Sequence, residues 1–217
     1  MKAALVQSAG FCLSALCIAT GAQANLLTNG SFENGSFVPN GDNTMSLTNG
    51  ATAMTGWTVI GDSLAWIGDP NPFSLTASDG IKFLDLTDYP VNAPFGGVSQ
   101  DIATVEGAFY RLSFSLGSSN LYGRPAALTA SAGDTTQLFT SALTGTNNDW
   151  AAQSMTFMAT GSTTTVSLLG TIGFAYIGLD DVSVELISTP VPEPSSVVLI
   201  LAGLGVLGFV ARRNKAA

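Results

Sequence analysis

The sequence predicts an all-β protein whose main domain is an antiparallel β-sandwich or jelly roll, flanked by an N-terminal signal peptide and one C-terminal transmembrane helix. Apolar and polar residues alternate in short segments such as "YRLSFSLG" at 110–117 and "DVSVEL" at 181–186. A period of two places one face of a strand in a core and the other in water. Turn signals, including Asn29-Gly30 and Asp79-Gly80, separate these segments.

Residues 1–24 have the three parts of a secretory signal peptide. Lys2 supplies a positive start, an apolar run follows, and Ala22-Gln23-Ala24 gives the small-x-small cleavage pattern. We therefore expect signal peptidase to cut before Asn25. The alternative is an uncleaved membrane anchor, but the apolar run is short and leads directly into the cleavage pattern.

Composition restricts the chemistry available to the mature chain. Both cysteines, Cys12 and Cys17, precede the expected cut, and the sequence has no histidine. Disulfides, Ser-His-Asp and Cys-His catalysis and imidazole metal sites are therefore excluded. Between residues 25 and 188 there are three basic and 14 acidic residues, a net charge of −11. Such a surface repels nucleic acid and anionic lipid.

Residues 25–188 are long enough for one domain with a real core. Helical periodicity is missing from this stretch, and we expect roughly nine or ten short strands. The first is expected at Leu26–Glu33, and the last ends near Leu186. The Gly-, Asn- and Thr-rich stretch Phe37–Thr55 is expected to be a long loop. A closed barrel is the alternative to a sandwich.

The C-terminal tail has three parts. Residues 189–194 form a Pro-rich linker that cannot continue a strand or helix. Residues 195–211 carry no charge and are just long enough to span a bilayer. The basic residues of 212–217 follow at once, so this end is expected in the cytoplasm and the acidic domain on the other side of the membrane.

The tail resembles the PEP-CTERM sorting signal of Gram-negative bacteria. The resemblance is carried by three features in order: the motif Pro192-Glu193-Pro194, the apolar segment, and then Arg212-Arg213. It implies processing by the membrane enzyme exosortase, transient membrane anchoring, and delivery to the surface or to the exopolysaccharide matrix of a biofilm. A plain single-pass anchor is the alternative.

The body resembles the choice-of-anchor C family through "NLLTNGSFE", "GWTVIGDSLAWIG", "ASDGIKFLDL", "GGVSQDI" and "IGLDDVSVEL". That family is similar to galactose-binding-like jelly rolls, the fold of many carbohydrate-binding modules. Residues 120–146 are short and rich in Gly and Ala for such a fold, which puts loop contacts there in doubt.

The resemblance also implies a structural calcium ion. In the resembled fold the first and last strands lie together, which would bring Glu33 near Asp180, and calcium accepts carboxylate and carbonyl oxygens in irregular geometry. Asp181 should point away from Asp180, because successive strand residues alternate. The alternative is that Glu33 caps a turn and Asp180 is a strand-end charge.

Aromatic residues in loops are the candidates for sugar binding, because rings stack on pyranose faces. They are Tyr89, Tyr122 and Trp150. Trp57 and Trp66 lie within strand patterns, so core packing is expected for them.

We identify no catalytic residues. A glycosidase needs two carboxylates at a defined separation, and no spacing selects a pair. A phosphate loop and a nucleophile elbow are also missing from the sequence. The expected function is therefore non-enzymatic glycan or exopolysaccharide binding at the cell surface. The alternatives are a purely structural or adhesive, calcium-stabilised protein and, less favoured, a carbohydrate-active hydrolase.

Overall fold

The protein is described by a computed structural model at residues 24–88, 94–118, 126–141, 149–172 and 176–189, together with Leu204 and Arg212. Over these residues the regular elements of the domain are eleven strands: β1 Thr44–Thr48, β2 Thr58–Gly61, β3 Ser63–Gly68, β4 Lys82–Asp85, β5 Gly96–Ala103, β6 Phe109–Ser118, β7 Ala126–Ala132, β8 Thr135–Ser141, β9 Asp149–Met158, β10 Thr163–Ile172 and β11 Gly178–Ser188.

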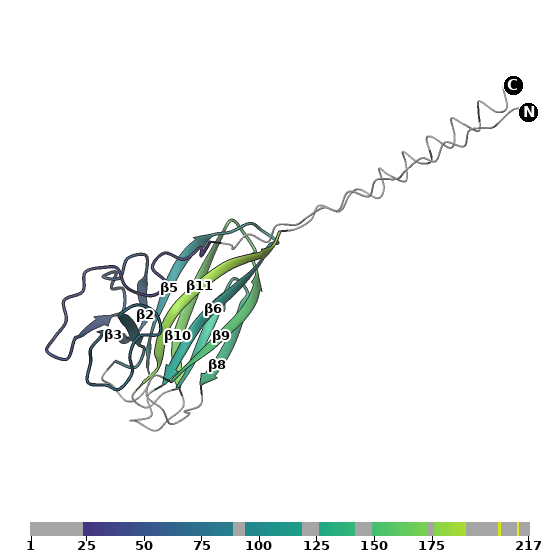
Figure 1. The fold of residues 1–217 in the computed structure, drawn as a ribbon. Coiled ribbons are helices and arrows are strands. Elements are labelled where there is room, and N and C mark those ends of the chain that lie inside the picture. The colour runs from purple at the N-terminus through teal and green to yellow at the C-terminus, as the bar shows by residue number, and fades with distance from the viewer. Residues whose placement is uncertain are drawn as a thin grey trace, which may run out of the picture.

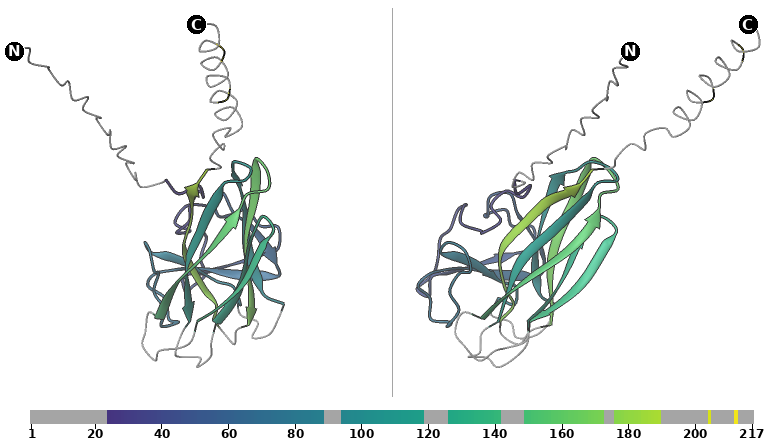
Figure 2. Two further views of the ribbon diagram at one scale, coloured as in Figure 1. Left: turned by 90° about the vertical axis from the view of Figure 1, so that its right-hand side faces the viewer. Right: turned by 45° about the vertical axis from the view of Figure 1, so that its right-hand side comes forward.

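The strands form two sheets that pack face to face (Figures 1 and 2). One sheet has the order β1-β3-β4-β11-β6-β9, and the other has the order β2-β5-β10-β7-β8. Every strand pair is antiparallel. The prediction of an all-β, two-sheet antiparallel sandwich is therefore confirmed for the body of the chain.

The core between the sheets is built by the alternation visible in the sequence. In β6, Tyr110, Leu112 and Phe114 are buried, and the residues between them point outward. Trp57 and Trp66 are fully buried, and their indole N–H groups donate to the carbonyl oxygens of Asn29 and Phe32. Their expected role in the core is confirmed, and each buried indole has the partner that such a group requires.

The expected first strand at Leu26–Glu33 does not form. Asn29 and Phe32 have left-handed backbone conformations, which break an extended run. The segment nevertheless lies beside β11: Leu26 N–H donates to the Val184 carbonyl, and Val182 N–H donates to the Gly30 carbonyl. The first and last parts of the domain are therefore neighbours, as the resemblance implies.

The expected long loop Phe37–Thr55 contains a strand, β1. Its sequence TMSLT alternates, and Leu47 is buried while Met45 packs against the core cluster. β1 pairs with β3 over five residues, which place Met45 opposite Trp66. The prediction of a loop was wrong here. Two apolar residues suffice for a short edge strand, and the many Gly and Asn residues around them made the whole stretch look like a loop.

The signal peptide 1–24 and the apolar segment 195–211 lie outside the described residues, apart from Ala24 and Leu204. Within the described part of the chain, the structure has no helix that is both long and apolar enough to span a bilayer.

Candidate functional site

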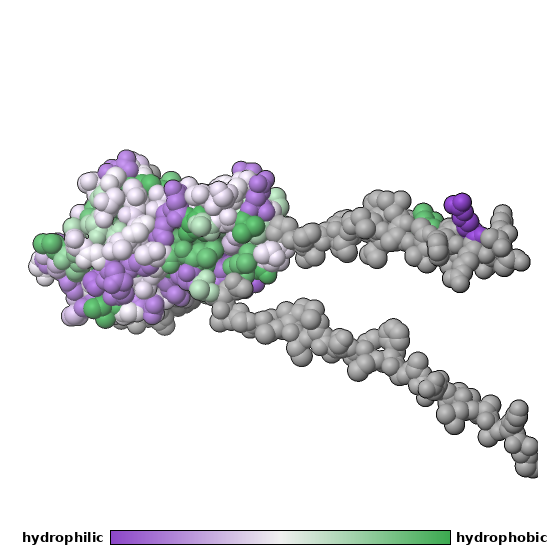
Figure 3. Space-filling view, turned by 90° about the horizontal axis from the view of Figure 1, so that it is seen from above, coloured by the Kyte–Doolittle hydropathy of each residue, from purple (hydrophilic) through white to green (hydrophobic). Residues whose placement is uncertain are grey.

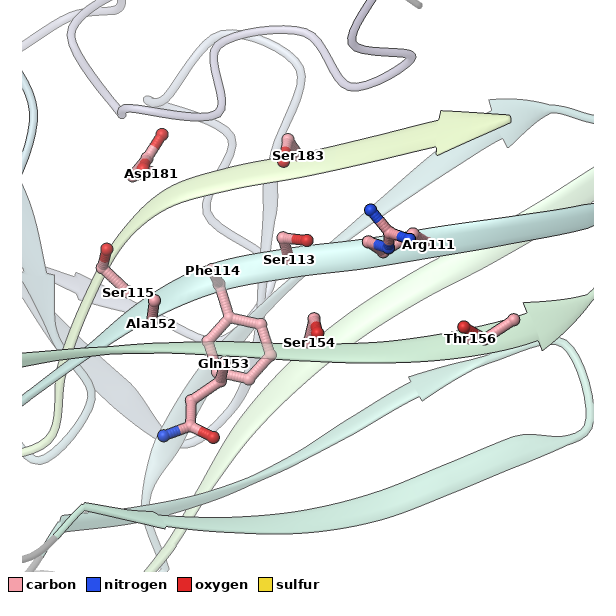
Figure 4. A pocket seen from close by; sticks show the side chains of 10 residues that line it. All are labelled: Arg111, Ser113, Phe114, Ser115, Ala152, Gln153, Ser154, Thr156, Asp181 and Ser183. Atoms are coloured by element: carbon pink, nitrogen blue, oxygen red, sulfur yellow. The ribbon is translucent and has the colours of Figure 1, made fainter. Parts of the chain in front are cut away.

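A polar groove of about 560 Å³ lies on the outer face of the six-stranded sheet, across β11, β6 and β9. Figure 4 shows most of its side chains in rows along the three strands, whereas those of Phe114 and Gln153 extend away from these rows. The residues that line this groove are Arg111, Ser113, Phe114 and Ser115 of β6, Ala152, Gln153, Ser154 and Thr156 of β9, and Asp181 and Ser183 of β11.

The register of the strands aligns these residues across the sheet. Ser113 lies opposite Ser154 on one side and Ser183 on the other. One step along, Arg111 lies opposite Thr156 and Glu185. Residues that face each other across antiparallel strands have Cβ atoms about 5 Å apart. The groove therefore presents two cross-strand rows of polar side chains on one surface.

These polar side chains are available to a ligand. The hydroxyl groups of Ser113, Ser154 and Ser183 make no hydrogen bond to any described residue, and the same holds for the Arg111 guanidinium. A serine hydroxyl both donates and accepts, whereas a guanidinium only donates. The groove can therefore bond a partner that itself offers many donors and acceptors.

The acidic side chain of Asp181 lies at one end of the groove. The strand pairing shifts between Asp180 and Ser183, and Asp181 takes a left-handed conformation at this bulge. Burial, together with the nearby charge of Asp79, raises the pKa of Asp181. Asp181 lines the groove, where its carboxylate is placed to accept hydrogen bonds from a ligand.

Two exposed apolar side chains lie beyond the other end of the groove. Phe109 and Met158 pair in register at the last position shared by β6 and β9, and both are exposed. Phe109 precedes Arg111 by two residues on β6, and Met158 follows Thr156 by two residues on β9, so both share the groove's face of the sheet.

Trp150, a predicted sugar contact, instead packs beside the groove. Its indole N–H donates to the Thr76 carbonyl, its ring contacts Phe83 edge-on, and Gly117 and Gly178 leave the space it fills. The loop around Thr76 covers this part of the sheet, where Trp150 joins a second apolar cluster with Phe83. The indole N–H of Trp150 and part of its ring therefore already contact other residues of the protein, which leaves less of the side chain for a sugar.

Glu33 and Asp180 bind the same short segment but through separate contacts. Glu33 accepts the backbone N–H groups of Ile81 and Lys82 and forms an ion pair with the Lys82 ammonium at 3.3 Å. Asp180 is buried and accepts the N–H groups of Ser78 and Asp79. Burial raises the pKa of Asp180 to about 7.

This arrangement does not fit a calcium ion held jointly by Glu33 and Asp180. The cation beside Glu33 is the Lys82 ammonium, and protein donors bond both carboxylates. Among the described residues there is also no group of three or more acidic, His or Cys side chains that could hold a metal. Calcium binding stays a prediction without support from these contacts.

Most of the remaining predicted site residues lie outside the part of the chain that the structure describes. Tyr89, Tyr122, the motif Pro192-Glu193-Pro194 and Arg213 lie outside the described residues, as does Ala22 of the cleavage pattern. Asn25, expected to follow the cut, is described: its side chain donates to the Val182 carbonyl and accepts the Val184 N–H. The predicted new N-terminus is thus fixed to β11.

Sequence comparison places this sandwich in a family. The family described as "Protein of unknown function (DUF642)" matches residues 25–172, and the chain belongs to it. The PEP-CTERM protein-sorting motif matches residues 190–214, which confirms the predicted sorting signal. This motif indicates export, exosortase processing and surface sorting in a Gram-negative bacterium. No curated protein matches the chain.

Several solved structures are similar to the chain. A family 35 carbohydrate binding module from Clostridium thermocellum is 8% identical, with 67% of this chain and 99% of that chain covered and a TM-score of 0.44. TmCBM61, solved with beta-1,4-galactotriose, is 20% identical, with 75% and 99% covered and a TM-score of 0.42. The CBM22-1 xylan-binding domain of Paenibacillus barcinonensis Xyn10C is 17% identical, with 67% and 94% covered and a TM-score of 0.40.

Proposed function

We propose that this exported protein is a non-catalytic, glycan-binding component of the cell surface or extracellular matrix, and that its ligand lies in the groove on β6, β9 and β11. We also propose that the body is of the choice-of-anchor C kind, on the strength of its opening and closing motifs. The observation that carries the proposal is the groove itself, with its aligned hydroxyl groups, one guanidinium and one carboxylate.

The chemistry of the groove matches a polyhydroxylated chain. Sugar hydroxyls donate and accept, as serine hydroxyls do, and adjacent sugar hydroxyls can share one guanidinium or one carboxylate. Arg111, which only donates, and the Asp181 carboxylate, which accepts, occupy different parts of the groove, with serine hydroxyls between them.

Charge favours a neutral glycan over an acidic one. Asp181 lies in the groove, and Glu185 is directly opposite Arg111 on β11, so two acidic side chains accompany the one basic side chain. The whole domain between residues 25 and 188 carries −11. An anionic polysaccharide would meet net repulsion, whereas uncharged hydroxyls would not.

Non-catalytic binding is the simplest use of this groove. Both standard glycosidase mechanisms use two carboxyl groups that flank the scissile bond. Of the residues that line the groove, Asp181 alone carries a carboxyl group, and the nearby Glu185 lies four residues further along the same strand, roughly 13 Å away at strand spacing, so the two do not flank one bond. We therefore propose retention of a polymer rather than its hydrolysis.

Affinity gel electrophoresis tests the proposal. The mature domain is run through gels that contain laminarin, hydroxyethylcellulose or dextran as neutral probes, or alginate as the anionic probe. We expect retardation by a neutral polymer that changes little with added salt, since no ion pair is formed. Ser113→Tyr, which fills the groove, should abolish retardation, while the matched control Thr136→Tyr on β8 should not. Retardation by alginate alone, or by none of the polymers, would contradict the proposal.

A further inference from the structure

Exposed apolar side chains gather at one end of the sandwich. Eight large hydrophobic residues of the described domain are exposed, and five of them belong to this end, with exposed fractions between 39% and 54%. They form the set that we name the apolar end: Leu26, Val105, Phe109, Met158 and Ile187.

The contacts of four chain segments bring these residues together. Phe109 pairs with Met158 on one side and with Ser188, next to Ile187, on the other. Val105 lies in the turn before β6, where its N–H donates to the Tyr110 hydroxyl. Leu26 donates its N–H to Val184 of β11. Figure 3 shows hydrophobic patches toward the right-hand end of the domain in that view.

The apolar end is also the end from which the sorting tail departs. β11 stops at Ser188, and the sequence then has only residues 189–194 before the uncharged segment 195–211 begins. Six residues span at most about 20 Å when fully extended. While segment 195–211 is embedded in a bilayer, the end of the sandwich that carries Ile187 must therefore stay within that distance of the lipid surface.

We propose that the apolar end is a lipid-docking surface, which rests on the bilayer while the sorting tail is still attached. The inference rests on the proposed export of this protein and on the transient membrane anchoring that the PEP-CTERM sorting motif implies. Burial of Phe109, Met158 and their neighbours in the interface removes apolar area from water. The tether makes contact with the bilayer intramolecular, whereas a second copy of the chain would have to be met by diffusion.

Charge indicates which lipids fit. Two acidic residues lie near the apolar end. Glu106 follows Val105 in the sequence, and Asp134 follows Gly133, which lies close to the Met158 carbonyl in the turn between β7 and β8. These carboxylates would be repelled by anionic headgroups. The docking surface therefore suits lipids with zwitterionic headgroups, such as phosphatidylcholine or phosphatidylethanolamine.

A fluorescent reporter can test this contact directly. The mature chain has no cysteine, so Val105→Cys introduces one thiol, which is labelled with a polarity-sensitive NBD dye. The matched control is Val38→Cys, which is also exposed and lies beside β1, at the opposite edge of the six-stranded sheet from β9. The chain from residue 25 to residue 217 is reconstituted in phosphatidylcholine vesicles, with or without lipids that carry a quenching spin label.

We expect the dye at position 105 to brighten severalfold and to be quenched by the labelled lipids, and the dye at position 38 to show neither effect. Phe109→Ser with Met158→Ser should abolish both effects at position 105 while the chain still floats with the vesicles. Vesicles of phosphatidylglycerol should give a weaker response at low salt. Both serine changes are at exposed positions, so folding should survive, and circular dichroism checks it.

Two other results would overturn the inference. If the chain floats with vesicles but the dye at position 105 behaves like the dye at position 38, the tail anchors the protein and the apolar end does not touch lipid. If the dye brightens without quenching by labelled lipids, another protein surface covers the apolar end. A chain that does not float would instead remove the membrane anchoring on which the inference rests, and glycan binding would be unaffected.

Discussion

Buried carboxylates hold the irregular parts of this fold in place. Asp85 is buried at the end of β4 and accepts the backbone N–H groups of Thr87 and Ile177 and the Thr87 hydroxyl. Burial raises its pKa to about 6, although these hydrogen bonds favour the charged form. Asp85 thus connects two loops, and keeping its buried side chain ionised costs folding free energy when the pH is above its pKa.

Asp85→Asn should change how stability depends on pH. Because the pKa of Asp85 rises on folding, its contribution to stability is fully present below about pH 4 and is lost as the pH rises through 6. The free energy of unfolding of Asp85→Asn relative to wild type should therefore increase from pH 4 to pH 7.5, by up to about 3 kcal/mol. Urea unfolding at several pH values measures this difference. Asp180 also titrates, but it is present in both proteins, so its contribution cancels from the difference.

The matching control is Asp85→Ala, which leaves the three donors without an acceptor. At pH 4 it should lower the free energy of unfolding by about 3 kcal/mol relative to wild type. This deficit should shrink as the pH rises, because Asp85→Ala removes the same titrating carboxyl as Asp85→Asn. Equal pH profiles for wild type and Asp85→Asn would show that Asp85 does not titrate in this window.

Glu33 and Lys82 lead to a second prediction at the residue scale. Because the Lys82 ammonium already neutralises Glu33, we expect the melting temperature of the domain to differ by less than about 1 °C between excess EDTA and excess calcium. Differential scanning calorimetry measures it. A rise of several degrees in calcium that Glu33→Gln and Asp180→Asn both abolish would restore the calcium site implied by the resemblance.

At the scale of elements, the segment before β1 completes the edge of β11. β11 pairs with β4 at only two positions, Gly178 and Leu179. Beyond them, the segment from Asn25 to Gly30 supplies the hydrogen-bond partners of β11. Gly30 approaches closely enough that a side chain there would collide with the Val182 carbonyl oxygen.

Gly30→Ala should therefore be strongly destabilising. An added Cβ would collide with the Val182 carbonyl oxygen, and the backbones of Gly30 and Val182 are hydrogen-bonded to each other and cannot easily move apart. We expect a loss of about 2 kcal/mol or more in the free energy of unfolding, measured by denaturant titration. Gly41→Ala is the control, since nothing lies within 4 Å of its Cβ and its change should be near zero. Equal stabilities of the two variants would show that the segment is not packed on β11.

The sequence predicted where strands lie along the chain better than it predicted which strands pair with each other. The alternation in β6 and β11 identified which residues face the core, and Ser113 and Ser183 were visible as members of the outward set. That β6 lies between β11 and β9 depends on pairings of residues far apart in the chain, so local periodicity does not contain it. The groove was missed for this reason. Trp150 was selected as a loop aromatic, but only the fold shows that Gly117 and Gly178 make space for its ring.

At the scale of the whole molecule, different regions serve different purposes. The loop around Thr76 and Trp150 covers one part of the outer face of the six-stranded sheet, and the polar groove occupies the neighbouring part. The apolar end lies where β11 leads into the sorting tail. A chain held at that end would present the groove along the side of the sandwich, where a long polymer can lie across the strands.

The location of glycan binding is the central claim, and amide spectra of the ¹⁵N-labelled mature domain test it most directly. Laminarihexaose and cellohexaose are added as neutral probes, and the amide shifts are mapped onto the chain. We predict shifts concentrated at Ser113, Ser154 and Ser183 and their neighbours on β6, β9 and β11, with β8 unaffected. Shifts confined to Tyr89, Tyr122 and their sequence neighbours, or no shifts at millimolar sugar, would contradict the account.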